Sequence, residues 1–131
     1  MNLLLDTHAL IWYLEADTRL SLKARHIIED SDNQVFVSLV TFYEMVIKIK
    51  IGKLPTHKKL SDFIKGTKKS LITIIPINEA QIIEYEQVPF YENHRDPFDR
   101  LLVATAISEN LAVVTIDEKF DLYKDIITII W

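Results

Sequence analysis

The sequence predicts an α/β fold: a three-layer α/β/α sandwich around a mainly parallel central sheet of about five strands. Short apolar runs that lack alternating polar residues recur along the chain, and such runs are typical of strands buried on both faces. Segments with helical spacing separate them, which favours right-handed strand–helix–strand crossovers. The 131 residues, of which 49% are hydrophobic, are predicted to form a single domain, residues 1–131.

Composition narrows the possible classes of protein. The chain has no cysteine, which excludes disulfides, a thiol nucleophile and thiolate metal sites. No secretory leader precedes the first apolar run, and no apolar stretch has the length of a membrane span. We therefore expect a cytoplasmic protein that has no membrane partner.

The charge is distributed unevenly. The formal net charge is -4, which argues against binding nucleic acid by bulk electrostatics. Residues 48–69, hereafter the basic segment, nevertheless carry eight lysines and one acidic residue, Asp62. The molecule is therefore predicted to be electrostatically polarised.

The first third of the chain predicts two strands and two helices. Residues 2–5 form an apolar run that ends at Asp6, which places this carboxylate at the carboxyl end of a strand. Residues 9–14 continue as an apolar helical segment, and residues 20–28 show the stripe of a second helix, with Ser21 near its start. Residues 35–37 form the second buried strand.

A helix follows this second strand. Thr41 and Glu44 have the spacing of a capping box, which is an ordinary structural explanation for the glutamate. Gly52 is well placed to end this helix in a left-handed conformation. Residues 58–69 then form a short amphipathic helix with lysines on its polar side.

The middle of the chain continues the alternation. Residues 71–77 are rich in β-branched side chains and predict a third strand, interrupted near its end by Pro76. Asn78 can cap a helix that extends to residue 88, and residues 89–95 form a loop.

The helix predicted from Asp96 to about residue 110 has a well-defined start. Asp96 has the chemistry of an N-cap, and Pro97 suits the first helical position. Asp99 falls in the first turn, where the helix dipole favours a carboxylate. Its position alone therefore does not require a functional role.

The last segments complete the sheet. Residues 112–116 predict a fourth strand that ends at Asp117, residues 120–122 predict one helical turn, and residues 126–130 predict a fifth strand.

Four carboxylates are expected at one edge of this sheet. Asp6 and Asp117 follow strands directly, while Glu44 and Asp99 lie in the first turns of helices that begin near the same edge. Ligands of open parallel sheets bind outside the carboxyl ends of the strands. Because like charges held close together raise one another's pKa or require a cation, these four acids indicate a metal site.

Oxygen ligands without cysteine indicate a hard ion, Mg²⁺ or Mn²⁺. Zinc is disfavoured because the four histidines show no ligand spacing. A site of this kind suits phosphodiester hydrolysis, since the metal activates a water molecule and stabilises charge on the leaving oxygen.

The motifs around these acids resemble those of the PIN-domain ribonucleases, and specifically the VapC-type toxins of type II toxin–antitoxin systems. The resembling segments span nearly the whole chain: residues 3–10, 38–44, 52–55, 94–102 and 114–117. The resemblance implies a PIN-like α/β/α sandwich and a metal-dependent endoribonuclease toxin, with RNA (tRNA among the candidates) as substrate. It also implies a homodimer, and a cognate antitoxin that blocks the site. The implied acidic quartet, catalytic and metal-binding, maps onto Asp6, Glu44, Asp99 and Asp117.

Other polar residues near the quartet have two interpretations each. Asp96 is interpreted as a cap, with indirect support of a metal ligand as the alternative, and the Thr115 hydroxyl either orients a metal-bound water or satisfies a strand end. Substrate phosphate could be bound by His94, Arg95 and Arg100. The alternative for the two arginines is an ion pair with the nearby acids.

The aromatic residues Trp12, Tyr13, Phe42 and Tyr43 are interpreted as core or dimer contacts rather than as platforms for base stacking. The basic segment has a functional hypothesis, in which it flanks the acids and holds the RNA backbone through salt-sensitive phosphate contacts. Its alternative is a solvated helix face.

Two other classes of protein share these features. A Mg²⁺-dependent phosphatase-like enzyme is the nearest rival, although Asp6 lacks the second aspartate two residues later that an aspartyl-phosphate mechanism of the haloacid dehalogenase type requires. A non-catalytic interaction module that binds metal is the other, and it would cleave no RNA.

Overall fold

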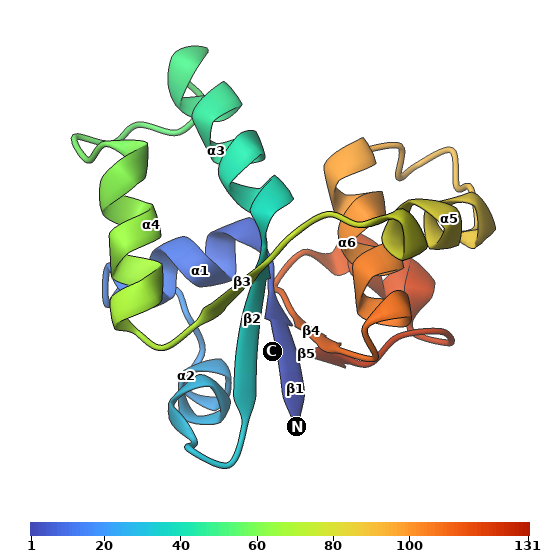
Figure 1. Cartoon of the computed structure of the whole chain (residues 1–131), viewed down its shortest axis with the longest axis horizontal. Helices are drawn as coiled ribbons and strands as arrows, with labels where there is room; N and C mark the ends of the chain where they lie inside the picture. The colour runs from blue at the N-terminus through green and yellow to red at the C-terminus, as the bar shows by residue number, and fades with distance from the viewer.

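The computed structural model describes all 131 residues and contains one five-stranded sheet in which every pair of neighbours is parallel. The strands follow the order β3-β2-β1-β4-β5 (Figure 1). Their bounds are β1 Asn2–Leu5, β2 Gln34–Ser38, β3 Thr73–Ile75, β4 Ala112–Val114 and β5 Ile129–Ile130. The prediction of an α/β fold with a parallel sheet is confirmed.

Strand β1 lies at the centre of the sheet. Its Leu4 is in register with Phe36 of β2 on one side and with Val113 of β4 on the other. Leu3, Leu4 and Leu5 have no exposed surface, as the unbroken apolar run predicts. The residue that follows β1, Asp6, is therefore held at the middle of the sheet's carboxyl edge.

Helices cover both faces of the sheet (Figure 1). Their bounds are α1 Thr7–Leu14, α2 Leu22–Glu29, α3 Leu39–Lys50, α4 Leu60–Lys69, α5 Glu79–Gln87, α6 Pro97–Ser108 and the 3₁₀ helix η1 Glu118–Tyr123. Helices α1, α2 and α4 pack in one hydrophobic core, whereas α6 and η1 pack in a second core on the opposite face. Helix α3 rises beyond the carboxyl edge and contributes to both cores.

Several helices begin where the sequence predicts. Ser21 caps α2, Asn78 caps α5 and Asp96 caps α6, each by accepting a backbone N–H through its side chain. Gly52 has a φ of 74° just after α3, as predicted for a left-handed helix end. The Asp96 cap fixes the start of α6, and with it the first turn that contains Asp99.

The predicted capping box of Thr41 and Glu44 is wrong. Helix α3 begins directly after β2, and Ser38 caps it by accepting the Val40 N–H. Thr41 is thus already inside the helix, where its buried hydroxyl has no hydrogen-bond partner. Glu44 lies in the second turn of α3 rather than in the predicted first turn, and its side chain pairs with Lys48.

Three strands, β3, β4 and β5, are shorter than predicted. The segments predicted at residues 71–77, 112–116 and 126–130 contain three, three and two strand residues. Only Val113 and Val114 find partners in β5, so pairing with a neighbour limits the strand more than its apolar composition does. None of the helices has the length and apolar composition of a membrane span.

Candidate active site

Asp6 is buried at the carboxyl end of β1 and also begins α1. Its Oδ1 accepts the Ala9 N–H at 2.8 Å, and its Oδ2 accepts the hydroxyl hydrogen of Thr115. The residue is only 6% exposed. Burial raises the pKa of Asp6 to about 6, against the opposing effect of these two hydrogen bonds, and the charges of Asp117 and Glu44 raise it further.

Thr115 connects the ends of two neighbouring strands. Besides donating to Asp6, its Oγ1 accepts the Asp117 N–H at 3.0 Å. The Asp117 side chain in turn caps η1 by accepting the Lys119 N–H at 3.0 Å. The hydroxyl therefore fixes Asp6 and the backbone of Asp117 relative to each other. Its role is thus more than pairing with a free backbone group at the end of a strand.

Asp99 lies in the first turn of α6, next to the cap residue Asp96. Its Oδ2 is 3.1 Å from His94 Nε2, and His94 Nδ1 is 2.7 Å from the Tyr123 hydroxyl. Because an ionised carboxylate only accepts, Nε2 of a neutral His94 donates to Asp99, and Nδ1 then accepts from Tyr123. His94 and Tyr123 are almost fully buried, so this chain of contacts fixes the Asp99 carboxylate from behind.

The pKa of Asp99 is also raised, to about 6. Burial is the main cause, and the hydrogen bond from His94 opposes it. The charges of Asp96 and Glu44 raise the pKa further. Two carboxylates on different elements, Asp6 and Asp99, are therefore both costly to ionise without a cation.

The charge of Glu44 acts on both of these acids and raises the pKa of each. Its Oε1 is 2.6 Å from Lys48 Nζ, one helical turn further along α3. Burial by itself lowers the pKa of Lys48, but the hydrogen bond to Glu44 and the charges of Glu44, Asp96 and Asp99 outweigh it and raise the pKa. Lys48 is therefore a permanent cation beside the acids.

The four predicted acids share one rim of the sheet but do not form a closed ligand cage. No three histidine, aspartate or glutamate side chains stand close enough together to hold one ion. The donors nevertheless fit Mg²⁺ or Mn²⁺, because such hard ions prefer carboxylate oxygens and would stabilise the ionised forms of Asp6 and Asp99, whose pKa values are raised. Glu44 offers these ions an oxygen, Oε2, that has no hydrogen bond, while its Oε1 is paired with Lys48.

The other predicted phosphate contacts have mostly structural roles. Arg100 is 5% exposed and donates to the carbonyls of Pro89 at 2.7 Å and Val88 at 3.2 Å, so it holds the loop before α6 rather than an acid. The Arg95 guanidinium lies over the Phe90 ring.

Two of the four aromatic residues, Trp12 and Phe42, lie in the core as predicted. Tyr43, by contrast, is 61% exposed and packs its ring edge against Phe98. The exposed ring of Tyr43 therefore contacts another aromatic ring rather than one of the acids.

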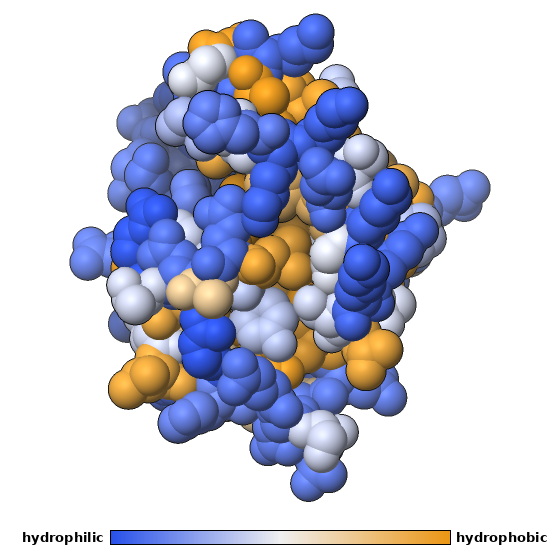
Figure 2. Space-filling view, turned by 90° about the vertical axis from the view of Figure 1, so that its left-hand side faces the viewer, coloured by the Kyte–Doolittle hydropathy of each residue, from blue (hydrophilic) through white to orange (hydrophobic).

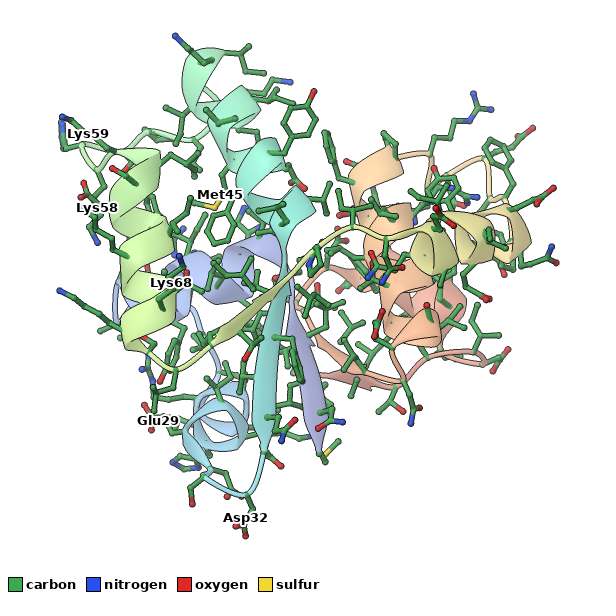
Figure 3. The ribbon with its side chains drawn as sticks, in the orientation of Figure 1. Glu29, Asp32, Met45, Lys58, Lys59 and Lys68 are labelled. Atoms are coloured by element: carbon green, nitrogen blue, oxygen red, sulfur yellow. The ribbon has the colours of Figure 1, made fainter.

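The basic segment lies mainly on the outer side of the molecule. Its helix α4 packs against α1. Figure 3 shows Lys58 and Lys59 on the outer side of the molecule, and Lys68 is exposed as well. Figure 2 shows that hydrophilic side chains cover much of this side. Lys48 is the one lysine of the segment that pairs with a member of the acidic quartet.

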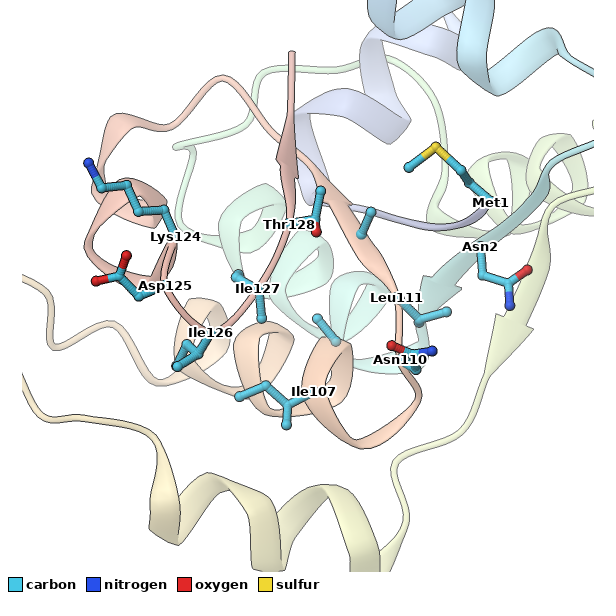
Figure 4. Close-up of a pocket in the computed structure, with 12 residues that line it drawn as sticks. Met1, Asn2, Ile107, Asn110, Leu111, Lys124, Asp125, Ile126, Ile127 and Thr128 are labelled. Carbon is cyan, nitrogen blue, oxygen red and sulfur yellow. The ribbon is translucent and has the colours of Figure 1, made fainter.

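A separate cavity opens at the opposite edge of the sheet (Figure 4). It is lined by residues near the amino ends of β1, β4 and β5, including Asn2, Asn110, Leu111 and Thr128. None of the four acids lines it. The cavity is therefore distinct from the acidic rim.

The interpretation of the sequence missed two features of the rim. Lys48 follows Glu44 by four residues, the spacing of an ion pair on one helix face, and this signal was available in the sequence. The contact of Tyr123 with His94 joins residues 29 apart, and no local pattern predicts it.

Comparison with known proteins agrees with this architecture. The chain matches the PIN domain over residues 3–126. The structure of VapBC2 from Rickettsia felis bound to a promoter DNA fragment matches with a TM-score of 0.66 and 19% identity, over 99% of this chain and 98% of that chain. VapBC-1 from nontypeable Haemophilus influenzae gives a TM-score of 0.68 and 17% identity, over 99% and 97% of the two chains.

FitAcB from Neisseria gonorrhoeae gives a TM-score of 0.64 and 22% identity, over 98% of this chain and 96% of that chain. No curated protein matches the chain. At such identities the structural likeness shows the fold, while the match to the PIN domain extends from β1 to the residues just before β5. The chain therefore belongs to the PIN-domain family.

Proposed function

We propose that this protein is a metal-dependent endoribonuclease and the toxin of a type II toxin–antitoxin pair. PIN domains are typically nucleases, and the similar structures include toxin–antitoxin complexes. The observation that carries the proposal is the pair of carboxylates at one rim of the sheet, buried Asp6 and half-buried Asp99, whose pKa values are both raised to about 6. A divalent cation is the partner that would stabilise both carboxylates in their ionised form.

The residues that would hold Mg²⁺, or Mn²⁺ in its place, are Asp6, Glu44, Asp99 and Asp117. When bound, the ion supplies an activated water and stabilises charge on the leaving oxygen. The chain's own contribution is to position the ligands. Thr115 and the Ala9 N–H fix both oxygens of Asp6, and His94 fixes one oxygen of Asp99 and leaves the other without a hydrogen bond.

The proposed partners besides RNA are an antitoxin and a second copy of the chain. An apolar hollow between α3, α5 and α6 supports an association of this kind, since Tyr43, Ile77 and Ile82 line it and are all exposed. Uncovered apolar surface that is contiguous favours a protein partner.

Cleavage of a mixed pool of structured RNAs tests the activity. Antitoxin-free protein is assayed with Mg²⁺, with Mn²⁺ and with EDTA, beside Asp6→Asn, Asp99→Asn and the control Asp17→Asn. Asp17 is an acid paired with Arg19 outside the rim. We expect metal-dependent cleavage that the control retains and that the two rim variants lose by about 100-fold or more.

Cleavage that survives both rim substitutions would refute the proposed site. Metal binding by the wild type without any cleavage would favour the interaction module. Hydrolysis of phosphomonoesters in place of RNA would favour the phosphatase-like alternative.

A further inference from the structure

We propose that Lys48 is a catalytic residue, whose ammonium group leaves Glu44 when the rim is loaded with a divalent cation and then binds a non-bridging oxygen of the phosphate being cleaved. This inference rests on the proposed function and deepens it, because it assigns a contact with the substrate to a residue outside the acidic quartet.

The first observation is that Lys48 is the single cationic partner of the quartet. The chain has 15 lysines and arginines, and Lys48 alone among them forms an ion pair with Asp6, Glu44, Asp99 or Asp117. Its Nζ lies 2.6 Å from Glu44 Oε1. The ammonium group of Lys48 therefore places a permanent positive charge next to the carboxylates of the quartet.

The second observation is that the two members of this pair differ in exposure. The side chain of Glu44 is 7% exposed, whereas that of Lys48 is 34% exposed. Lys48 can therefore turn toward solvent, or toward a bound substrate, while Glu44 stays in the rim.

The third observation is the geometry of α3. The helix rises beyond the carboxyl edge of the sheet, and Lys48 is one turn further from the sheet than Glu44 (Figure 1). A phosphate bound over carboxylates at the edge would therefore lie on the Lys48 side of Glu44. The cation that pairs with Glu44 is therefore in place to pair with the substrate as well.

The chemistry of phosphodiester hydrolysis requires such a charge. A water oxygen forms a new bond to phosphorus while the bond from phosphorus to the leaving ribose oxygen breaks, the water loses a proton, and the leaving oxygen gains one. Negative charge stays on the two non-bridging oxygens throughout, and a preorganised ammonium group stabilises it. Lys48 keeps its protons in this step and acts only through its charge and hydrogen bonds.

The test compares Lys48→Gln and Lys48→Arg with wild type, and uses Lys50→Gln as the matched control. Lys50 is an exposed lysine on the same helix that pairs with no acid. Cleavage of an RNA substrate is measured at saturating RNA and Mn²⁺, and Mn²⁺ affinity is measured separately by calorimetry without RNA.

We expect Lys48→Gln to lower kcat by about 100-fold, as the loss of one donor to a developing charge does in other enzymes, while Lys48→Arg recovers part of it and Lys50→Gln stays within about twofold. We also expect Lys48→Gln to bind Mn²⁺ at least as tightly as wild type, because the competing ammonium has been removed from Glu44. This combination separates contact with substrate from support of the metal site.

Three results would overturn the inference. A kcat within about twofold of wild type for Lys48→Gln would show that Lys48 is only a counter-ion. Weaker Mn²⁺ binding, together with cleavage restored by excess Mn²⁺, would show that Lys48 merely orients Glu44. Absence of RNA cleavage by the wild type would overturn the proposed function itself and this inference with it, whereas the first two results leave the proposed function intact.

Discussion

Replacing Asp6 by asparagine is expected to stabilise the metal-free protein at neutral pH. Burial raises the pKa of Asp6 from 3.8 to about 6, so the folded protein binds this proton more tightly than the unfolded chain does. The free energy of unfolding therefore decreases as the pH rises from about 4 to about 6, and above that window the whole penalty is present. Asparagine has the same shape and carries no charge.

The magnitude follows from the pKa change. A rise from 3.8 to about 6 corresponds to roughly 3 kcal/mol of unfavourable free energy at pH 7.5. Asparagine keeps an acceptor for the Ala9 N–H but weakens the contact with the Thr115 hydroxyl, which costs about 1 kcal/mol. We expect a net stabilisation of about 2 kcal/mol, or an increase in Tm of roughly 8 °C for a chain of this size.

The assay is thermal and urea unfolding in EDTA at pH 7.5 and at pH 4.5. The gain of Asp6→Asn over wild type should be large at pH 7.5 and small or absent at pH 4.5, where wild-type Asp6 is protonated. Asp17→Asn is the control, because hydrogen bonds from Arg19 hold the pKa of Asp17 at about 2 and removing that carboxylate should not stabilise the fold. An Asp6→Asn variant that is less stable than wild type at pH 7.5 would refute the reasoning.

Two further predictions concern the backbone and the basic segment. Gly52→Ala should destabilise the protein by about 1 kcal/mol, because Gly52 has a φ of 74°, which disfavours residues with a side chain. Gly66 lies inside α4 with only ordinary contacts around the added methyl group, so Gly66→Ala should be neutral or stabilising by up to about 1 kcal/mol. Urea unfolding compares the two variants directly, and equal effects would contradict the conformational argument. Replacing the outer lysines by glutamine should weaken RNA binding. It should also reduce the slope of log affinity against log salt concentration by about 0.7 for each RNA phosphate that is no longer neutralised. Both quantities are measured by titrating labelled RNA into the Asp6→Asn variant at several salt concentrations. If affinity and slope are unchanged, the basic segment is only a solvated face. The outer lysines are Lys58, Lys59, Lys65, Lys68 and Lys69.

Lys48 is left intact in that experiment for a physical reason. It pairs with Glu44, whereas the outer lysines make no contact with the quartet. Effects of the outer lysines on affinity and of Lys48 on kcat should therefore be separable and close to additive.

The sequence alone determined the fold class and the positions of the acids along the chain. Apolar runs such as residues 2–5 predict buried strands, and local hydrogen bonds place Ser21, Asn78 and Asp96 at helix starts. These properties depend on residues a few positions apart, and short-range patterns record them. The motifs around the quartet were also enough to identify the PIN-domain resemblance that the family match confirms.

Only the tertiary structure decided what each acid touches. The Thr115 hydroxyl reaches Asp6 across 109 residues because β4 lies beside β1, and Tyr123 reaches His94 because η1 and α6 pack in the same hydrophobic core. Burial at that junction raises the pKa of Asp6, and no sequence pattern reports how much water a carboxylate keeps. Strand order and burial are collective results of packing, so the sequence predicts which residues form the rim, whereas the fold determines their electrostatics.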